Sequence, residues 1–358
     1  MTSPRVGKRV VVTTVVAVLA LAIFVAACGS KSNASTGSSS APASSNSKTL
    51  VGAGSTLIAP LMSQWQPAYN TQAGVAVTYG AIGSGGGIAQ ITARTVDFGA
   101  SDAPLTPDQF TAAKGVVQIP WALAATLVAY NTKGVPNQLK LSGPVLADIW
   151  MGTVKTWNDP AIAKLNPGVS LPSTKITPVY RTDGSGDTYA FTNYLSHVSP
   201  EWQSKIGAST QVQFPTGLGG KGNSGVGGVI SSTNGSIGYI AISYVFSNKF
   251  DYALIQNAAG KFPVPGIPSI SAAAATLTSV PADNNVSIVD PPASAPGAYP
   301  ISTFTYAIVP LSSPKAAALT PFLTWAITTG QASGPPLNFA PLPAMVVTAD
   351  KATIAKIK

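Results

Sequence analysis

From Thr49 onward the chain alternates short apolar segments with helix-like segments, and glycine or proline separates most of them. Strands that alternate with helices along a chain usually build a sheet that helices cover. The segments typical of strands are VAVTY at 75–79, VDFGAS at 96–101, TLVAYN at 126–131, ITPVYR at 176–181, SIGYIAIS at 236–243 and TFTYAIVP at 303–310. The sequence therefore predicts an α/β fold.

Apolar residues at spacings of three and four predict the helices. The clearest series is Ile58, Leu61, Met62, Trp65 and Tyr69. Proline fits the first turn of a helix but not its interior, so Pro60 suits this helix and Pro67 should kink or end it. Further helices are expected around Ile88 and Ile91, around Leu146, Ile149 and Trp150, around Phe191, Tyr194, Leu195 and Val198, and as one short helix at 272–277.

The N-terminal segment is typical of an export signal. Basic residues at Arg5, Lys8 and Arg9 precede an apolar run at 10–27, which stops at Cys28. Small residues before a lone cysteine resemble a bacterial lipobox, in which the cysteine is lipidated after cleavage. The pattern predicts a signal peptide at 1–28, a lipid on Cys28 and a Ser-rich tether at 29–48. The expected location is the extracytoplasmic face of the cell membrane, and the lone cysteine excludes a disulfide within the chain.

Charge is sparse in this chain. Only 9% of its 358 residues are charged, while 45% are hydrophobic, so the chain has ample material for a core. The formal net charge of +9 falls to +6 without the three basic residues of the signal (9 − 3 = 6). Because lysines and arginines form no run, nucleic acid is not an expected partner.

Four loops rich in small residues lie between strand-like and helix-like segments. They are GAGSTLIAP at 52–60, AIGSGGGIAQI at 81–91, DFGASDAPL at 97–105 and RTDGSGDTYAF at 181–191. Glycine allows close approach, hydroxyls donate hydrogen bonds, and a helix start offers unpaired N–H groups. Each loop alone is also explained as a turn with a Ser or Thr cap. Several together favour an anion site, since Arg181 is the only arginine after Arg94 and suits a tetrahedral oxyanion.

The sequence contains few residues or motifs that indicate an enzyme. His197 is the only histidine and Glu201 the only glutamate, so neither a general base nor a metal cluster is indicated, and no catalytic residue, metal or cofactor is expected. Neither Ser84 nor Ser185 lies in a G-x-S-x-G motif. The segment GLGGKGNSG at 217–225 fails as a nucleotide loop, because Gly222 follows Lys221 where Ser or Thr is required.

Taken together, these loops resemble a known family. VGAGSTLIAPL, YGAIGSGGGIAQI, TVDFGASDAPL, KTWNDPAIAKLNPG, YRTDGSGDTYAFTNYL and PTGLGGKGNSGV are similar, in order and spacing, to segments of the PstS family. These are the phosphate-binding proteins of the bacterial high-affinity phosphate importer. The likeness runs from about Leu50 to Val226 and continues more weakly to the C-terminus.

The resemblance implies a two-lobed venus-flytrap solute-binding protein of the type II periplasmic binding fold, in which each lobe is a mixed sheet flanked by helices. One lobe would comprise 49–131 plus 303–358, and the other 132–302. It further implies a monomer that binds inorganic phosphate in the cleft and delivers it to a membrane permease and its ATPase. It implies no cofactor.

The resemblance also implies roles for individual residues. Thr56 and the Leu57 N–H would bind phosphate from the first loop, and Ser84 and Asp102 from the next two. Arg181, Ser185 and Gly186 would bind it from the second lobe, with Asp183 orienting Arg181. Two positions depart from the family: Leu57 stands where phenylalanine is frequent, and Asp187 where threonine is frequent. Either Thr188 replaces that hydroxyl, or Asp187 accepts a second ligand proton.

Asp102 gives an independent chemical argument. Phosphate carries one or two protons at neutral pH and sulfate carries none, so an ionised carboxylate can pair with phosphate but faces a bare oxygen of sulfate. The alternatives left open are a receptor for another oxyanion, a secreted phosphatase, and a surface adhesin on the same scaffold.

Overall fold

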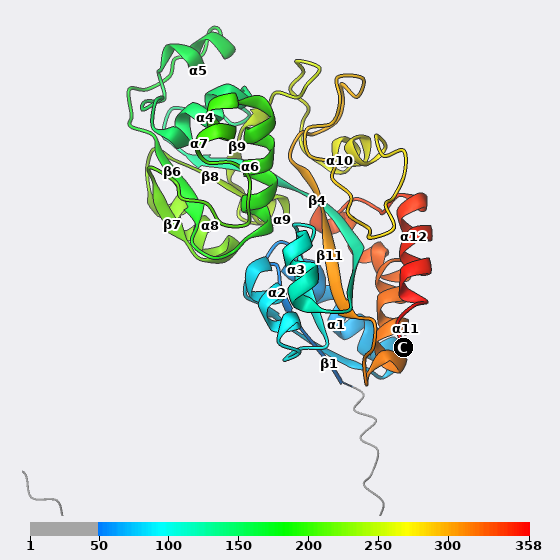
Figure 1. Ribbon diagram of the computed structural model, residues 1–358. Coiled ribbons are helices and arrows are strands. Elements are labelled where there is room, and N and C mark those ends of the chain that lie inside the picture. Colours follow the sequence, from blue (N-terminus) through cyan, green and yellow to red (C-terminus); the bar gives the residue numbers. More distant parts are fainter. Residues whose placement is uncertain (1–48) are drawn as a thin grey trace, which may run out of the picture. The chain divides into compact units, whose positions relative to one another are not determined.

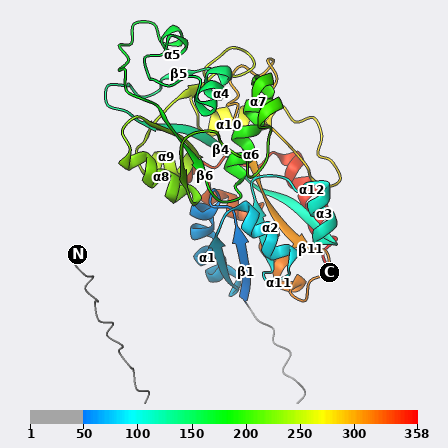
Figure 2. The same ribbon diagram turned by 60° about the vertical axis from the view of Figure 1, so that its left-hand side comes forward.

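Strand β4 (Val116–Asn131) belongs to two sheets and joins the two lobes of residues 49–358, the part of the chain that the computed structural model describes (Figures 1 and 2). Residues 116–125 of β4 pair with strand β11 (Ser302–Pro310) in the first sheet. Residues 126–131 pair with strand β8 (Ser236–Ala241) in the second. The predictions about Cys28, the export signal and the tether at 29–48 concern residues outside the described part.

The first lobe is built on the strand order β2-β1-β3-β11-β4. Strands β1, β2 and β3 are parallel, whereas β11 is antiparallel to both its neighbours. The further elements of this lobe are β1 (Thr49–Gly54), α1 (Ala59–Ala73), β2 (Ala76–Ala81), α2 (Ser84–Thr92), β3 (Phe98–Ser101), α3 (Pro107–Ala113), α11 (Ala316–Ala326), η1 (Thr329–Ser333), η2 (Pro335–Leu337) and α12 (Ala344–Ile354). Its core centres on edge-to-face contacts of Trp121 with Trp65, Phe98 and Phe322.

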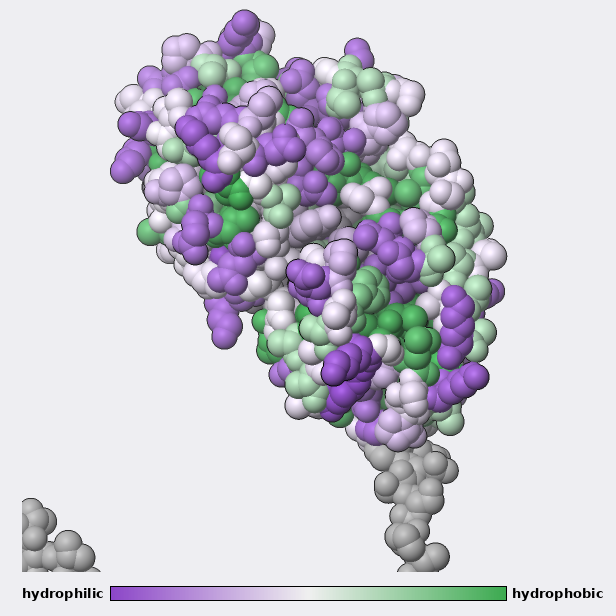
Figure 3. Space-filling view, viewed as in Figure 1, coloured by the Kyte–Doolittle hydropathy of each residue, from purple (hydrophilic) through white to green (hydrophobic). Residues whose placement is uncertain are grey.

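The second lobe is built on the order β4-β8-β6-β7, in which β8, β6 and β7 are parallel. Its elements are β5 (Lys140–Leu141), α4 (Gly143–Met151), α5 (Pro160–Leu165), β6 (Thr177–Arg181), α6 (Gly186–Val198), α7 (Pro200–Lys205), β7 (Leu218–Gly220), α8 (Gly222–Ser232), α9 (Ile242–Ser247), β9 (Asp251–Tyr252) and β10 (Leu254–Ile255). Helix α10 (Ile267–Ala274) contacts β4 and β11. Phe191 stacks on Tyr239 and contacts Trp150 in the core. On the face shown in Figure 3, polar residues are spread over both lobes with apolar residues between them.

The α/β fold predicted from the sequence is confirmed, with local differences. Helix α1 runs past Pro67 to Ala73, because Pro67 lies on the exposed side of a helix whose other face buries Leu61, Trp65 and Tyr69. Water can satisfy the backbone carbonyl that a proline leaves unpaired there. The short helix expected at 272–277 is α10, which begins earlier, at Ile267. Strand β4 begins ten residues before the predicted segment 126–131, since both its neighbours bury it.

Candidate anion-binding site

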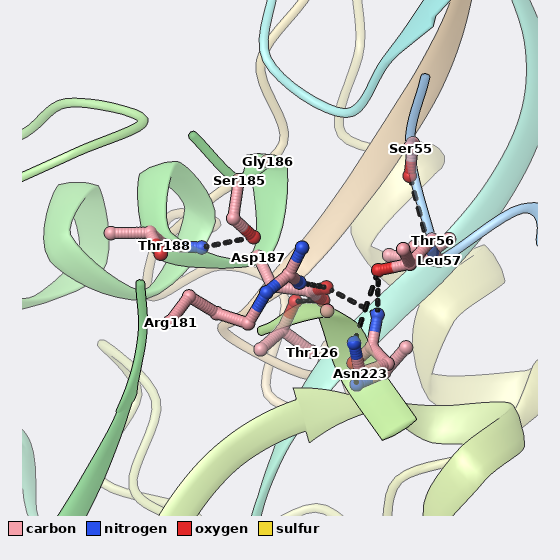
Figure 4. A network of polar contacts seen from close by, with 12 residues as sticks. Ser55, Thr56, Leu57, Thr126, Arg181, Ser185, Gly186, Asp187, Thr188 and Asn223 are labelled. Atoms are coloured by element: carbon pink, nitrogen blue, oxygen red, sulfur yellow. Dashed lines mark hydrogen bonds and ion pairs between the residues drawn. The ribbon is translucent and has the colours of Figure 1, made fainter. Parts of the chain in front are cut away.

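The predicted loops meet where strands of both lobes end and helices begin. In the first lobe, β1 and β3 lead to Ser55–Leu57 and to Asp102, and α2 begins at Ser84. In the second lobe, β6 ends at Arg181 and helices α6 and α8 begin at Gly186 and Gly222. Crevices beyond the carboxyl ends of parallel strands are common ligand sites, and helix N-termini favour anions. Figure 4 shows Ser55, Thr56 and Leu57 of the first lobe close to Arg181, Asp187 and Asn223 of the second.

Arg181 is the cation of this site, and two aspartates hold its guanidinium. Its Nε and Nη2 donate to the two oxygens of Asp183 at 2.8 and 2.5 Å, and its Nη1 donates to Asp187 at 3.0 Å. The Arg181 side chain is only 1% exposed. A guanidinium has five N–H donors, so one N–H on Nη1 and one on Nη2 remain for a further acceptor. These two donors of one planar guanidinium suit the oxygens of a tetrahedral anion.

Asp183 is positioned from two sides, as the sequence predicted for an orienting residue. Besides Arg181, the Gly222 N–H at the start of α8 donates to its Oδ1 at 2.9 Å. Burial acts to raise the pKa of Asp183, but the hydrogen bonds and charge of Arg181 outweigh it and lower the pKa. Asp183 therefore stays ionised and fixes the guanidinium.

Asp187, at the position that departs from the family, is completely buried in the first turn of α6. Its Oδ1 accepts a hydrogen bond from Thr126 at 2.7 Å, and its Oδ2 accepts from Arg181 and, at 2.8 Å, from Asn223. Burial raises its pKa, although the nearby Arg181 charge opposes that shift. In this structure Asp187 thus holds the second side of the guanidinium.

Asp102 is a second buried carboxyl group, supplied by the first lobe. Ser55 and Thr305 donate to its two oxygens at 2.6 and 2.9 Å, and Ser84 lies 3.5 Å from Oδ2. Burial, helped by the charge of Asp187, raises the pKa of Asp102 to about 7. A carboxyl group with this pKa favours contact with a proton, either its own or that of a partner.

The remaining predicted residues donate or accept within the same cluster. The Leu57 N–H donates to Ser55 Oγ at 3.0 Å, and Ser84 Oγ accepts from the N–H groups of Asp102 and Gly186. In the second lobe, Ser185 Oγ accepts from the Thr188 N–H at 3.3 Å and so caps α6, while the Thr188 hydroxyl pairs with Tyr239 at 2.8 Å. All nine predicted phosphate ligands lie in this cluster: Thr56, Leu57, Ser84, Asp102, Arg181, Ser185, Gly186, Asp187 and Thr188.

The two lobes touch directly at this site. The Gly186 N–H donates to Ser84 Oγ at 3.0 Å, the Gly85 N–H donates to the Gly184 carbonyl at 2.9 Å, and Asn223 Nδ2 donates to Thr56 Oγ1 at 2.8 Å. These contacts describe a closed arrangement. Beside them lies a cavity of about 240 Å³, lined by Thr56 and Ile82 on one side and by Asp183, Lys221 and Tyr244 on the other.

Several residues of the site were not predicted from the sequence. Thr303 and Thr305 donate to Asp102 from β11, and Thr126 donates to Asp187 from β4. A sequence pattern could have indicated Thr303 and Thr305: their hydroxyls occupy alternate positions of TFTYAIVP and so lie on one face of the strand. Asn223 was not predicted, because its glycine-rich loop failed as a nucleotide loop and the family resemblance assigned no role to a residue of PTGLGGKGNSGV.

Other predictions concern positions away from this cluster. His197 is exposed, and its Nδ1 lies 3.9 Å from Asp290. Among residues 49–358, no group of three or more His, Cys, Asp or Glu side chains is arranged to hold a metal. None of the helices in that same range has the length and apolar character needed to span a membrane.

Comparison with known proteins places this arrangement in a family. Residues 39–329 match the profile of the PBP superfamily domain. The phosphate-binding protein PstS of Xylella fastidiosa is 42% identical over 343 residues, which cover 92% of this chain and 93% of that one. PstS of Pasteurella multocida is 40% identical over 304 residues, covering 84% of this chain and 88% of the relative.

Among solved structures, a phosphate-binding protein from Stenotrophomonas maltophilia shares the fold. It superposes with a TM-score of 0.68 at 19% identity, over 85% of this chain and 93% of that chain. The fold and the sequence relatives agree. The chain belongs to the PBP superfamily, and within it to the PstS family of phosphate-binding proteins.

Proposed function

We propose that this protein is the extracytoplasmic phosphate receptor of an ATP-driven phosphate importer. One observation carries the proposal: a buried arginine with two unused N–H donors shares a site with a buried carboxyl group whose pKa is about 7. The arginine attracts an oxyanion, and the carboxyl group, when it is ionised, pairs only with an oxyanion that brings a proton. Phosphate meets both requirements at neutral pH, whereas sulfate meets only the first.

The charge balance of the site supports a protonated ligand. Arg181 contributes +1 and ionised Asp102, Asp183 and Asp187 contribute −3, which sums to −2. Any oxyanion adds negative charge to this excess in a region shielded from water, and a proton that the ligand shares with a carboxylate reduces the repulsion between them. Hydroxyls, helix N-termini and shared ligand protons must therefore supply much of the stabilisation.

In this proposal phosphate takes up the two free donors of Arg181 and hydrogen bonds from Thr56, Leu57, Ser84, Ser185, Gly186 and Thr188. Some of these donors are paired with each other in the structure, as Gly186 is with Ser84, and phosphate would compete for them. Asp102 would accept one ligand proton. Asp187 has the pKa shift and the position to accept a second, which favours that alternative over simple replacement by Thr188.

The proposal extends to the surroundings of the receptor. The protein would act as a monomer, tethered through lipid on Cys28 and the 29–48 segment to the membrane that holds the permease and ATPase. A tether of this kind raises the local concentration of the receptor at its partner. The lobes 49–131 plus 303–358 and 132–302 would close over phosphate, and no turnover takes place.

Uptake of radiolabelled phosphate by cells that lack their own phosphate receptor tests this function. The full chain should restore uptake at low phosphate. Arg181→Ala should not, because the variant loses the two free N–H donors of the guanidinium. Arg94→Ala is the matched control, since Arg94 donates only to the backbone carbonyls of Ile91, Ala113 and Lys114. Uptake restored equally by Arg181→Ala would contradict the proposal.

A further inference from the structure

Asn223 is a buried side chain that contacts both lobes. It is the second residue of α8, and it is 0% exposed. Its Nδ2 donates to Thr56 Oγ1 of the first lobe and to Asp187 Oδ2 of the second, each at 2.8 Å. Its backbone N–H also donates to Thr56 Oγ1 at 3.2 Å, and its Oδ1 accepts from the Ala241 N–H at 2.8 Å. Figure 4 shows Asn223 between Thr56 and Asp187.

These bonds fix the direction in which the Thr56 hydroxyl works. A threonine oxygen has two lone pairs and one hydrogen. Both hydrogen bonds from Asn223 end on Oγ1 and occupy the two lone pairs, so the O–H is left to donate elsewhere. Thr56 is thereby a donor toward the site, which suits an unprotonated oxygen of an anion.

The same amide acts in the opposite sense on Asp187. Asn223 and Arg181 both donate to Oδ2, while Thr126 donates to Oδ1. Three donors favour the ionised carboxylate, which works as an acceptor. One asparagine therefore makes Thr56 a donor and supports Asp187 as an acceptor.

We infer that Asn223 is a positioning residue that latches the two lobes and sets the hydrogen-bonding polarity of Thr56 and Asp187. The inference rests on the proposed function of the same site. A hinge opening moves Thr56 and Asn223 apart because they belong to different lobes, so the latch forms only on closure. A latch of this kind holds the ligand after it has entered, and its loss speeds release more than it slows binding.

The chain offers a matched control for a purely structural role. Asn166 is also buried and makes three hydrogen bonds of 2.9 Å, but all its partners, Lys140 and Ile162, belong to the second lobe. Asn166→Ala thus removes a comparable buried network without touching the contact between lobes.

The test measures phosphate binding and release by stopped flow in the full chain, with thermal unfolding recorded without phosphate. Asn223→Ala should raise the release rate about tenfold to a hundredfold, as expected for the loss of the buried cross-lobe hydrogen bond from Nδ2 to Thr56, and should leave the association rate within about twofold. Asn166→Ala should lower the unfolding temperature while leaving the release rate unchanged. If Asn223→Ala does not fold, Asn223→Ser is the second variant, because it is uncharged and too short to bridge Thr56 and Asp187, and it should also release phosphate faster.

A double-mutant cycle with Thr56→Val isolates the route through Thr56. If Asn223 acts through the hydroxyl, Asn223→Ala should accelerate release less in the Thr56→Val background than in the wild-type chain. An unchanged release rate in folded Asn223→Ala, with phosphate bound by the wild type, would overturn the inference alone. A wild-type chain that binds no phosphate would instead overturn the proposed function.

Discussion

Asp102 and Asp187 approach one cation from opposite lobes, and burial raises the pKa of both. The arrangement is costly when both groups are ionised, because the charge of each raises the energy of the other. A ligand that brings protons relieves this cost. In the proposed function, the selectivity of the site therefore follows from its carboxyl groups, and its attraction for anions follows from Arg181.

The first prediction concerns Asp102→Asn, which replaces an acceptor with an amide that can also donate. The contact with this position should then weaken sulfate binding less. The ratio of phosphate affinity to sulfate affinity should fall by about a hundredfold. Calorimetric titration of both anions measures the ratio. Asp97→Asn is the control, because Asp97 lies before the start of β3, at the opposite end of that strand from Asp102, and accepts hydrogen bonds from Lys315 and the Val51 N–H. A ratio that changes equally in both variants would contradict this role of Asp102.

The second prediction concerns Asp350, which is completely buried in α12 and has no hydrogen-bond partner for either oxygen within residues 49–358. Burial raises its pKa to about 9. Between about pH 4 and pH 9 the folded protein holds a proton on Asp350 that the unfolded chain has lost. The free energy of unfolding therefore falls as pH rises through that window. Asp350→Asn removes this dependence and should raise the free energy of unfolding by a few kcal/mol at pH 8.

Denaturant unfolding at pH 5 and pH 8 checks the sign of this effect. The gain from Asp350→Asn should be larger at pH 8 than at pH 5. Asp251→Asn changes an exposed carboxyl group and should bring no such gain. A gain that is independent of pH would contradict the assignment.

At the level of elements, the site depends on how closely α6 approaches the first lobe. A Cβ at Gly186 would lie 2.3 Å from Asp102 Cβ, so the start of this helix leaves no room for a side chain when the lobes meet. The Gly186 N–H also donates across the interface to Ser84. The close approach, rather than the N–H contact, requires glycine at the first position of the helix.

The third prediction follows from that contact. Gly186→Ala keeps the N–H but blocks closure, so phosphate affinity should fall by more than about a hundredfold while the fold is retained. In α8, a Cβ at Gly228 meets nothing within 4 Å. Gly228→Ala should leave affinity unchanged and stabilise the helix by about 0.5–1 kcal/mol. Equal affinity in the two variants would show that the close approach is unimportant.

Local sequence patterns predict only some of the residues at this site. Loops in which small residues follow a strand and precede a helix predicted the positions of Ser84, Asp102 and Arg181, because strand ends and helix starts converge in α/β folds. Local patterns could not predict that Thr126 and Thr305 reach the two carboxyl groups. Those contacts depend on the pairing of β11 with β3 and of β4 with β8, which brings together residues far apart in the chain.

Asn223 and Pro67 show two further limits. The role of Asn223 depends on a contact between lobes, which no local pattern contains. Pro67 satisfies the rule for a helix breaker, yet burial of one face of α1 outweighs the lost hydrogen bond on the other. In both cases tertiary packing decides the outcome.

At the level of the whole molecule, one strand shared by two sheets joins the lobes and supplies Thr126 to the site. The lobe boundaries at 131 and 303 remain a prediction. Asn284, assigned by that prediction to the second lobe, donates to the carbonyl of Gln118 in β4 and to Thr353 in α12. The segment around Asn284 therefore packs against elements of the first lobe.

The central claim is that this closed site holds a protonated oxyanion between Arg181 and Asp102. Calorimetric titration of the wild-type chain with phosphate and with sulfate at neutral pH tests it most directly. Phosphate should bind at least about a hundredfold more tightly than sulfate, because only phosphate brings a proton to Asp102. Comparable affinity for the two anions, or no binding of phosphate, would contradict the claim.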